Sequence, residues 1–227
     1  MRQSYSAPVE FTIYQQGHNP GPQPFDCYAT AFSLPYLLGM YEPLPMPAPY
    51  LRLDPAWRTA WRERLGPATG LRVGINWAGN ATHVNDWRRS ISAKRFLQLL
   101  TDHPEIRFYS LQLEPPNAEV ESLREAGLID LTTHITDFAD TAAFVSELDL
   151  VISVDTAVVH LAGALGRPVW TLTPLAPDWR WGLERDDTPW YPTMRLFRQK
   201  RAGDWDEVIQ RVNAALGSVG PSVVTGH

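Results

Sequence analysis

The sequence contains one cysteine, Cys27, among its 227 residues, so no disulfide can form within the chain. A reducing compartment fits this composition, and a lone cysteine also excludes a cysteine-based zinc site. The six histidines have no metal-binding spacing such as HExxH. No apolar run approaches the ~20 residues of a membrane span, and the first residues lack the apolar core of a signal peptide. We therefore expect a cytoplasmic protein with at most a peripheral membrane association.

An excess of basic residues is also missing, since 20 Lys and Arg stand against 25 Asp and Glu. Nucleic-acid binding requires a basic face, so no nucleic-acid partner is expected. The apolar fraction of 44% is that of an ordinary globular protein, and the length suits one large domain or one domain plus a fragment. Proline, by contrast, is abundant and clusters between Pro20 and Pro67.

The pattern of the chain changes at residue 70. Residues 1–69 have no sustained period, and their prolines break helices and interior strands, so we predict an irregular Pro-rich arm. Short helices are expected in it near Leu34–Leu38 and over Pro55–Leu65. Residues 70–216 alternate between strand and helix patterns and predict one domain. Residues 217–227 are predicted to be a disordered tail.

The alternating pattern predicts an α/β fold with a Rossmann-like parallel sheet and helices on both faces. Ser92 and Asp140 are the expected helix caps, and Gly127 is expected to end a helix. In the common strand order 3-2-1-4-5-6, ligands bind where the order reverses, between the first and fourth strands. Strands are predicted at 71–77, 106–113, 128–132 (a weak third strand), 149–154, 168–173 and 194–199, and helices at 93–103, 115–127, 140–148, 156–166 and 204–216.

The segment SVDTAVVHLAGALG, residues 153–166, lies at that reversal point. Its helix starts at about Thr156, and the free amides and dipole of a helix N-terminus attract phosphate. Thr156 adds a hydroxyl, Ala157 allows close approach to the backbone, and His160 lies one turn further along. The alternative is an ordinary turn in which Asp155 caps the helix and His160 is merely buried. The residues alone leave the two interpretations open.

The loop after the first strand, within GINWAGNATHVNDWRRSIS at residues 74–92, faces the same point. It matches neither glycine fingerprint, because GxGxxG is absent and Gly79 is followed by Asn80 where a P-loop has Lys. Arginine makes forked contacts with phosphate oxygens. A solvated loop explains Arg88 better than Arg89, which adjoins the helix start. The loop's polar candidates are Asn80, Asn85, Arg88, Arg89 and Ser90.

A third unusual segment, Pro174–Pro192, is a long loop rich in tryptophan and proline. Such loops in compact domains are usually functional or disordered, and four aromatic residues argue against disorder. They predict either the wall of a base or sugar pocket or a cover over the sheet or a domain interface. Asp137 and Phe138 are expected either to contact a nucleoside or to cap a helix. The candidates for the base or sugar pocket are Trp77, Gln112, Asp137, Phe138, Trp179 and Arg180.

One segment resembles the nucleotide-binding motif of the bacterial heptosyltransferase-like family 9 glycosyltransferases, namely VISVDTAVVHLAGALGRPVW. The similarity is greater to a branch often attached to tetratricopeptide repeats. It covers about Phe25 to Leu216, and its segments occur in the family's order. Those segments are WAGN, RRSIS, SLQ, DFADTAA, SVDTAVVHLAGALG, APDWRW and TPWYPTMRLFRQ.

The resemblance implies a GT-B architecture of two facing Rossmann-like domains. The C-terminal one would bind a nucleotide-diphosphate sugar without a required metal, and the helix from Asp204 would pack toward the N-terminal one. Only about 24 residues precede Phe25, so we expect most of the acceptor domain, which normally supplies the base, to be missing. The residues carried over to the diphosphate site are Asp155, Thr156, Ala157 and His160, with Gly79, Asn80 and Arg89 in the opposing loop.

The function implied is an inverting transfer of a hexosyl or heptosyl group from a nucleotide-diphosphate sugar to a hydroxyl acceptor. The helix end at Thr156 and the Arg89 side chain would stabilise the leaving diphosphate. Transfer also needs both partners positioned and usually a general base, for which no residue is identified. The alternatives are a catalytically incomplete nucleotide-sugar-binding module, completed by a partner chain, and a vestigial fragment. A nicotinamide dehydrogenase is disfavoured by the missing glycine fingerprint.

Overall fold

The structure, a computed structural model, describes residues 33–39, 49–67, 70–113 and 118–219. The chain divides into two compact units, Met1–Glu42 and Pro43–His227. In the first unit, α1 (Leu34–Leu37) confirms the short helix expected near Leu34–Leu38. The second, called the sheet unit below, contains the other helices and strands. This division differs from the predicted boundary at residue 70. Of the predicted tail, residues 220–227 lie outside the described residues.

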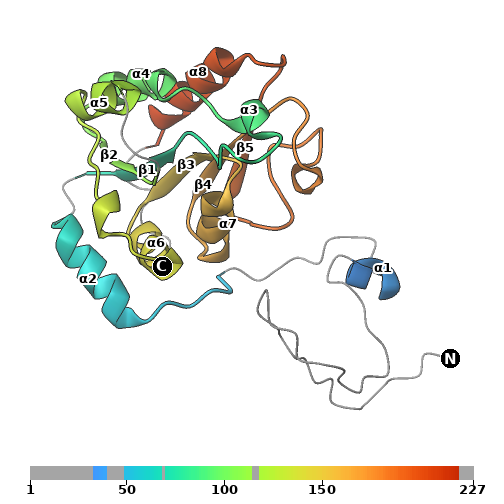
Figure 1. Cartoon of the computed structure of the whole chain (residues 1–227), viewed down its shortest axis with the longest axis horizontal. Helices are drawn as coiled ribbons and strands as arrows, with labels where there is room; N and C mark the ends of the chain where they lie inside the picture. The colour runs from blue at the N-terminus through green and yellow to red at the C-terminus, as the bar shows by residue number, and fades with distance from the viewer. Residues whose placement is uncertain (1–32, 40–48, 68–69, 114–117, 220–227) are drawn as a thin grey trace, which may run out of the picture. The chain divides into compact units, whose positions relative to one another are not determined.

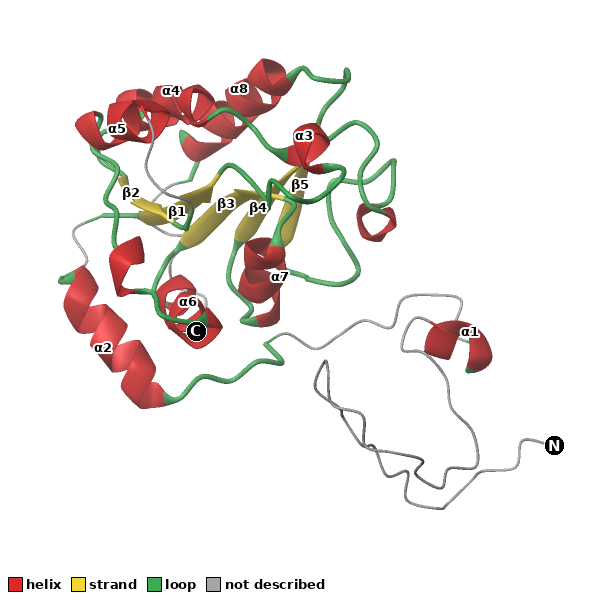
Figure 2. Ribbon diagram, viewed as in Figure 1, coloured by secondary structure: helices red, strands yellow, loops and turns green. Residues whose placement is uncertain are grey.

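The sheet has five parallel strands in the order β2-β1-β3-β4-β5 (Figure 2). Nearly every strand residue is buried, as in a parallel sheet covered on both faces. The strand order therefore reverses between β1 and β3, which are the predicted first and fourth strands, as expected. The strands are β1 (Arg72–Asn76), β2 (Arg107–Ser110), β3 (Leu150–Val154), β4 (Val169–Thr173) and β5 (Met194–Arg198).

The predicted third strand at 128–132 is wrong in extent. Ile129 forms only an isolated bridge with Tyr109, beside β2. The carboxylate of Asp130 then accepts hydrogen bonds from the backbone N–H and hydroxyl of Thr132, at 2.9 and 2.6 Å. Because this local bonding turns the chain into a 3-10 helix at Thr132–His134, the strand cannot continue.

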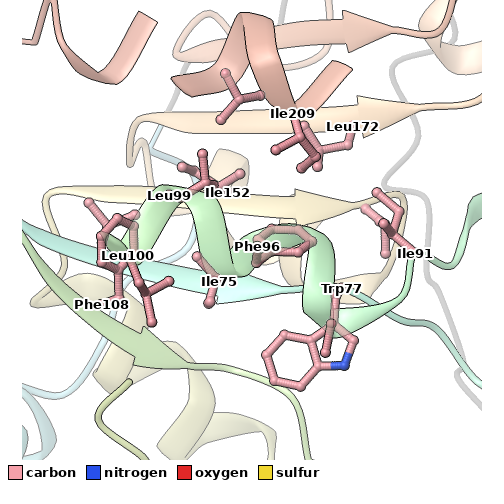
Figure 3. Close-up of a cluster of buried hydrophobic side chains, with 14 of the residues drawn as sticks. Ile75, Trp77, Ile91, Phe96, Leu99, Leu100, Phe108, Ile152, Leu172 and Ile209 are labelled. Carbon is pink, nitrogen blue, oxygen red and sulfur yellow. The ribbon is translucent and has the colours of Figure 1, made fainter. Parts of the chain in front are cut away.

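Helices cover both faces of the sheet, which confirms the predicted fold class (Figure 1). One face is covered by α4 (Leu97–Asp102), α5 (Ala118–Glu125) and α8 (Trp205–Leu216), and the other by α2 (Pro55–Leu65), α6 (Phe138–Ser146) and α7 (Ala157–Ala164). Between the first three helices and the strands lies a core cluster that includes Phe96, Ile75 and Leu172 (Figure 3). A separate core cluster lies between the other three helices and the sheet. The short α3 (Asp86–Arg89) lies in the loop after β1.

Helix α2 packs against α6, although the sequence placed it in an irregular arm. Trp61 is only 1% exposed and stacks on Phe144 with ring centroids 4.6 Å apart. Glu147, just after α6, pairs with two α2 guanidinium groups at 2.9 Å, those of Arg58 and Arg62. These contacts join α2 to the sheet unit, which explains why the division falls before it.

One predicted cap needs correction. Asp137 caps α6, which is one of its two expected roles, because its carboxylate accepts the Asp140 backbone N–H at 2.8 Å, whereas Asp140 lies inside the first turn. Ser92 occupies the predicted N-cap position, before the 3-10 turn Ala93–Phe96, but its hydroxyl donates to Glu119 and makes no capping hydrogen bond. Gly127 follows α5 with a φ of 103°, as expected for a helix end. Within the described residues, no helix has both the length and the apolar character needed to cross a bilayer.

Candidate functional site

A cavity of about 430 Å³ opens at the carboxyl ends of β1, β3 and β4, beside the reversal in strand order. Its walls come from the loop after β1, the start of α7 and the loop after β4. Ligands of doubly wound sheets bind at such a place. Eight of the predicted residues line it: Asn85, Arg88, Arg89, Asp155, Thr156, Ala157, His160 and Arg180.

The N-terminus of α7 forms one wall of this cavity. Thr156 occupies the N-cap position with extended backbone, and its side chain makes no capping hydrogen bond. Asp155 is not the cap, since its Oδ2 accepts the indole N–H of Trp181 at 2.8 Å. The predicted cap at Asp155 is therefore wrong, because Thr156 occupies that position. The first two amides of α7, those of Ala157 and Val158, have no helical partner, and Thr156 and Ala157 line the cavity.

A cluster of polar side chains holds Thr156 in place, and sequence reasoning missed it. The buried Asn76 at the end of β1 donates through Nδ2 to Thr156 Oγ1 at 3.1 Å and to Ser153 Oγ at 3.2 Å. Asn76 and Ser153 are 3% and 0% exposed. Their signal in the sequence is a polar residue near the end of each of two otherwise apolar strands. The cluster fixes the turn after β3 against the end of β1.

Arg89 connects the two predicted loops. Its Nη1 donates to the backbone oxygen of Asp155 at 2.9 Å, and its Nε donates to Asp86 Oδ1 at 3.0 Å. The other oxygen of Asp86 accepts the Ser90 hydroxyl at 2.7 Å, and Ser90 Oγ in turn accepts the Gly79 N–H at 2.9 Å. Asp86 was not predicted. The network presents a half-buried guanidinium group to the cavity in one fixed orientation.

Gly79 and Asn80 lie in the same loop but do not line the cavity. A Cβ atom at Gly79 would come within 2.6 Å of Arg89 Nη2 and would also overlap Asp86. Gly79 is thus required for the close approach of these two side chains. Asn80 turns its Oδ1 to the backbone N–H and hydroxyl of Thr82, at 2.9 and 2.8 Å. Both residues shape the loop without lining the cavity themselves.

His160 lies between two aromatic residues at the cavity wall. Its ring stacks on Trp181 at 5.2 Å between centroids, and its Nδ1 is 3.0 Å from the Tyr191 hydroxyl. Its Nε2 is 3.9 Å from Asp155 Oδ1. Burial lowers the pKa of His160 below its ordinary value of 6.5, although Asp155 opposes this shift. The imidazole is therefore mostly neutral at pH 7.

The four aromatic residues of the long loop take different places. Trp181 is fully buried and Tyr191 is 9% exposed, so both support His160. Trp190 is half-buried and donates to the Arg180 carbonyl at 3.2 Å. Trp179 is 69% exposed and packs edge-on against Trp190 outside the cavity wall. Arg180 lines the cavity and pairs with Asp178 at 2.7 Å.

A second cavity, of about 360 Å³, lies beside the carboxyl ends of β1 and β2. The predicted residues Trp77 and Gln112 line it, and Gln112 Oε1 accepts the Ala78 N–H at 3.0 Å. The predicted Asp137 and Phe138 line neither cavity. Asp137 is occupied as the α6 cap, and the Phe138 ring is exposed to solvent.

The first cavity has the chemistry of an anion site. It combines a helix N-terminus, the guanidinium groups of Arg88, Arg89 and Arg180, and a neutral imidazole. Its carboxylates, Asp155 and Asp178, already accept hydrogen bonds from Trp181 and Arg180. Across the described parts of the chain, no group of three His, Cys, Asp or Glu side chains is arranged to hold a metal ion.

Comparison with known families gives a match over part of the chain. The model described as "Glycosyltransferase family 9 (heptosyltransferase)" matches residues 120–210, which is less than half of the sequence. The matched range includes β3, α7, β4, the aromatic loop and β5. It therefore includes one side of the first cavity and excludes the loop that carries Arg89.

One curated relative is Protein FlbA of Caulobacter vibrioides (strain ATCC 19089 / CIP 103742 / CB 15). It is 33% identical over 195 residues, which is 81% of this chain and 31% of the relative. The chain therefore spans about a third of that relative's length. The name of that relative describes no chemistry.

Two solved structures resemble the fold. Escherichia coli ADP-heptose lps heptosyltransferase II has a TM-score of 0.52 at 13% identity, covering 76% of this chain and 55% of that one. Escherichia coli heptosyltransferase WaaC with ADP has a TM-score of 0.50 at 18% identity, covering 75% and 51%. At these identities the likeness concerns the fold alone, and the chain spans about half of each structure. The chain thus has the α/β fold of about half of a GT-B heptosyltransferase and is similar to the family 9 glycosyltransferases over residues 120–210.

Proposed function

We propose that the sheet unit is the donor-binding half of a family 9-like glycosyltransferase, which moves a sugar from a nucleotide-diphosphate donor to a hydroxyl acceptor. One observation carries the proposal. The N-terminus of α7, free of a side-chain cap, faces the same cavity as the fixed guanidinium group of Arg89. The similarity over residues 120–210 supports the choice of donor class.

The diphosphate is the part of the donor that suits the first cavity. Its oxygens would accept hydrogen bonds from the first-turn amides of α7 and from the Thr156 hydroxyl. Arg89 has its orientation fixed before a ligand enters, so binding costs little side-chain entropy. Arg88 and Arg180 add charge at the cavity wall. We propose that these groups neutralise the diphosphate without a metal ion.

The second cavity suits the nucleoside or sugar portion of the donor. It offers the buried indole of Trp77 and the amide group of Gln112 at the ends of adjacent strands. A stacking surface with a few polar groups is the usual composition of such a pocket. Asp137, Phe138 and Trp179 are not part of this proposal, because none of them lines either cavity.

In the proposed reaction, the acceptor oxygen forms a bond to the anomeric carbon as the bond from that carbon to the diphosphate breaks. Negative charge grows on the leaving diphosphate, where the α7 amides and Arg89 stabilise it more strongly than in the ground state. The acceptor's proton leaves to a base that we do not assign among the described residues. The chain spans about half of each solved structure, so we propose sugar transfer for the whole protein and donor binding for the sheet unit.

Calorimetry with UDP, GDP and ADP tests donor binding. At least one diphosphate should bind with a Kd below millimolar, and Arg89→Ala should weaken it roughly 10- to 100-fold, the value of a charge-assisted hydrogen bond. Arg95→Ala is the matched control, since Arg95 pairs with Asp206 of α8 and does not line the first cavity. If no diphosphate binds and Arg89→Ala behaves like Arg95→Ala, the proposal is wrong.

The second candidate is a nucleotide-sugar-binding module without turnover of its own, completed by a partner chain. The observation that favours it is that both cavities offer groups suited to holding a donor, while no base for transfer is assigned among the described residues. Hydrolysis of bound donors by water separates the two candidates. Slow release of sugar that depends on Arg89 favours the enzyme, and binding without any release favours the module.

A further inference from the structure

Tyr191 reaches the buried side of His160 from the loop before β5. Its hydroxyl is 3.0 Å from His160 Nδ1, and its side chain is 9% exposed. The ring packs over Gly163, which follows His160 by one turn of α7. A Cβ atom at Gly163 would lie 2.9 Å from Tyr191 Cβ and would overlap the ring itself. Gly163 therefore makes room for the tyrosine that contacts His160.

The other ring nitrogen of His160 faces a carboxylate. Its Nε2 is 3.9 Å from Asp155 Oδ1, while the second oxygen of Asp155 accepts the Trp181 indole N–H. Trp181 also stacks on the imidazole, with an angle of 21° between the rings. The stacking holds the ring plane, so each nitrogen keeps one distinct neighbour.

These neighbours differ in what they can offer. A neutral imidazole has one N–H donor and one acceptor nitrogen. The Asp155 carboxylate, 3.9 Å from Nε2, favours the proton on that nitrogen, since its lone pair would otherwise be directed at a negative charge. The other nitrogen, Nδ1, then accepts a hydrogen bond from the Tyr191 hydroxyl. The neighbour of Nε2 therefore determines whether Nδ1 carries a proton.

The Tyr191 hydroxyl stays protonated, so it can act as the donor in this arrangement. Burial is the main cause that raises the pKa of Tyr191 far above its ordinary value. The backbone N–H groups of Tyr50 and Leu51 both donate to the Ala164 carbonyl at the end of α7, at 3.0 and 3.2 Å. The segment before α2 is thereby fixed to the end of α7, the helix that carries His160.

We propose that Tyr191 is a positioning residue that holds His160 as the tautomer with its proton on Nε2, so that this N–H is offered to an anionic ligand in the cavity. The identity of that ligand rests on the proposed function, whereas the tautomer belongs to the free protein. Gly163 contributes to this arrangement, because the absence of a side chain leaves space for the Tyr191 ring. His160 then recognises an anion through a neutral N–H donor, without a change of protonation.

Long-range 1H–15N NMR of the imidazole nitrogens tests the tautomer without any ligand. In the wild-type protein at pH 7.5, Nε2 should have the shift of a protonated nitrogen and Nδ1 that of an acceptor. Tyr191→Phe should move both shifts toward a mixture of tautomers. His103, which bonds to Asn213 and is remote from Tyr191, provides the internal reference, and its shifts should not change.

The wild-type spectrum alone decides the tautomer, so the test holds even where Tyr191→Phe folds poorly. A proton on Nδ1 in the wild type, or unchanged His160 shifts in a folded Tyr191→Phe, would overturn the inference. Calorimetry adds the link to function, and Tyr191→Phe should weaken nucleoside diphosphate binding by about 3- to 10-fold. If the tautomer is as stated but UDP, GDP and ADP all fail to bind, the proposed function is wrong and the role of Tyr191 in positioning His160 stands.

Discussion

Arg89 is the residue on which the geometry of the first cavity most depends. Its guanidinium group joins α3 to the backbone of Asp155, and Asp86 holds it in that position. The sequence indicated Arg89 because it adjoins a helix start. It could not indicate Asp86, since a lone Asp in a polar loop has many equivalent interpretations until its partners are known.

Asp86→Ala should therefore affect both stability and binding. Removing the carboxylate leaves the Arg89 Nε and the Ser90 hydroxyl without their partner, which should lower the free energy of unfolding by ~1–2 kcal/mol. Diphosphate binding should also weaken several-fold, because Arg89 gains freedom. Asp206→Ala is the control, since its exposed ion pair with Arg95 should contribute below about 1 kcal/mol. Urea unfolding and calorimetry measure the two effects, and equal losses in both variants would contradict the role given to Asp86.

His160 gives a pH dependence with a defined sign. Burial depresses its pKa in the folded state, and Asp155 and Asp178 oppose that shift while Arg180 adds to it. The unfolded chain therefore binds the proton at a higher pH than the folded one. Stability from this group is complete above pH 6.5 and falls as the pH drops toward the folded pKa.

His160→Gln removes this effect while keeping a neutral polar side chain. Between pH 7.5 and 5.5, the wild type should lose more unfolding free energy than the variant, because carboxylates elsewhere titrate alike in both. Urea unfolding at the two pH values measures the difference. Equal losses of unfolding free energy in the two proteins would contradict a lowered pKa of His160 in the folded state.

At the scale of elements, the order of strands and helices followed from periodicity. Short apolar runs alternate with helical patterns, and the structure reproduces that alternation from β1 to α8 except at the predicted third strand. The cap of α6 was ambiguous, because Asp137 and Asp140 are both suitable and only the backbone geometry selects the first. The packing of α2 could not be predicted, since its contacts with Phe144 and Glu147 join residues that lie more than 80 positions apart in the sequence.

Two tryptophans of α2 provide a matched test of that packing. Trp61 is 1% exposed against α6, whereas Trp57, on the same helix, is 50% exposed. Trp61→Ala should cost ~3–5 kcal/mol of unfolding free energy, as for a buried aromatic residue. Trp57→Ala should cost about 1 kcal/mol or less. Urea unfolding compares the two, and similar costs would mean that α2 does not pack on the sheet unit as described.

At the scale of the whole molecule, the position of the site was predictable and its complete wall was not. The reversal of strand order between β1 and β3 located the cavity from topology alone. Asp178 and the polar cluster around Asn76 escaped prediction, because their roles arise only when β1, β3 and β4 lie side by side. Gly79 and Asn80 were predicted as site residues, but neither of them lines the cavity.

The central claim is that the N-terminus of α7 and Arg89 hold the diphosphate of a nucleotide donor. Amide NMR of the 15N-labelled protein, titrated with UDP, GDP and ADP, tests it most directly. The account predicts that one of these ligands shifts the backbone resonances of Thr156, Ala157 and Val158 together with the side-chain Nε–H of Arg89. Saturable shifts confined to other parts of the chain, or no shifts at millimolar ligand, would contradict it.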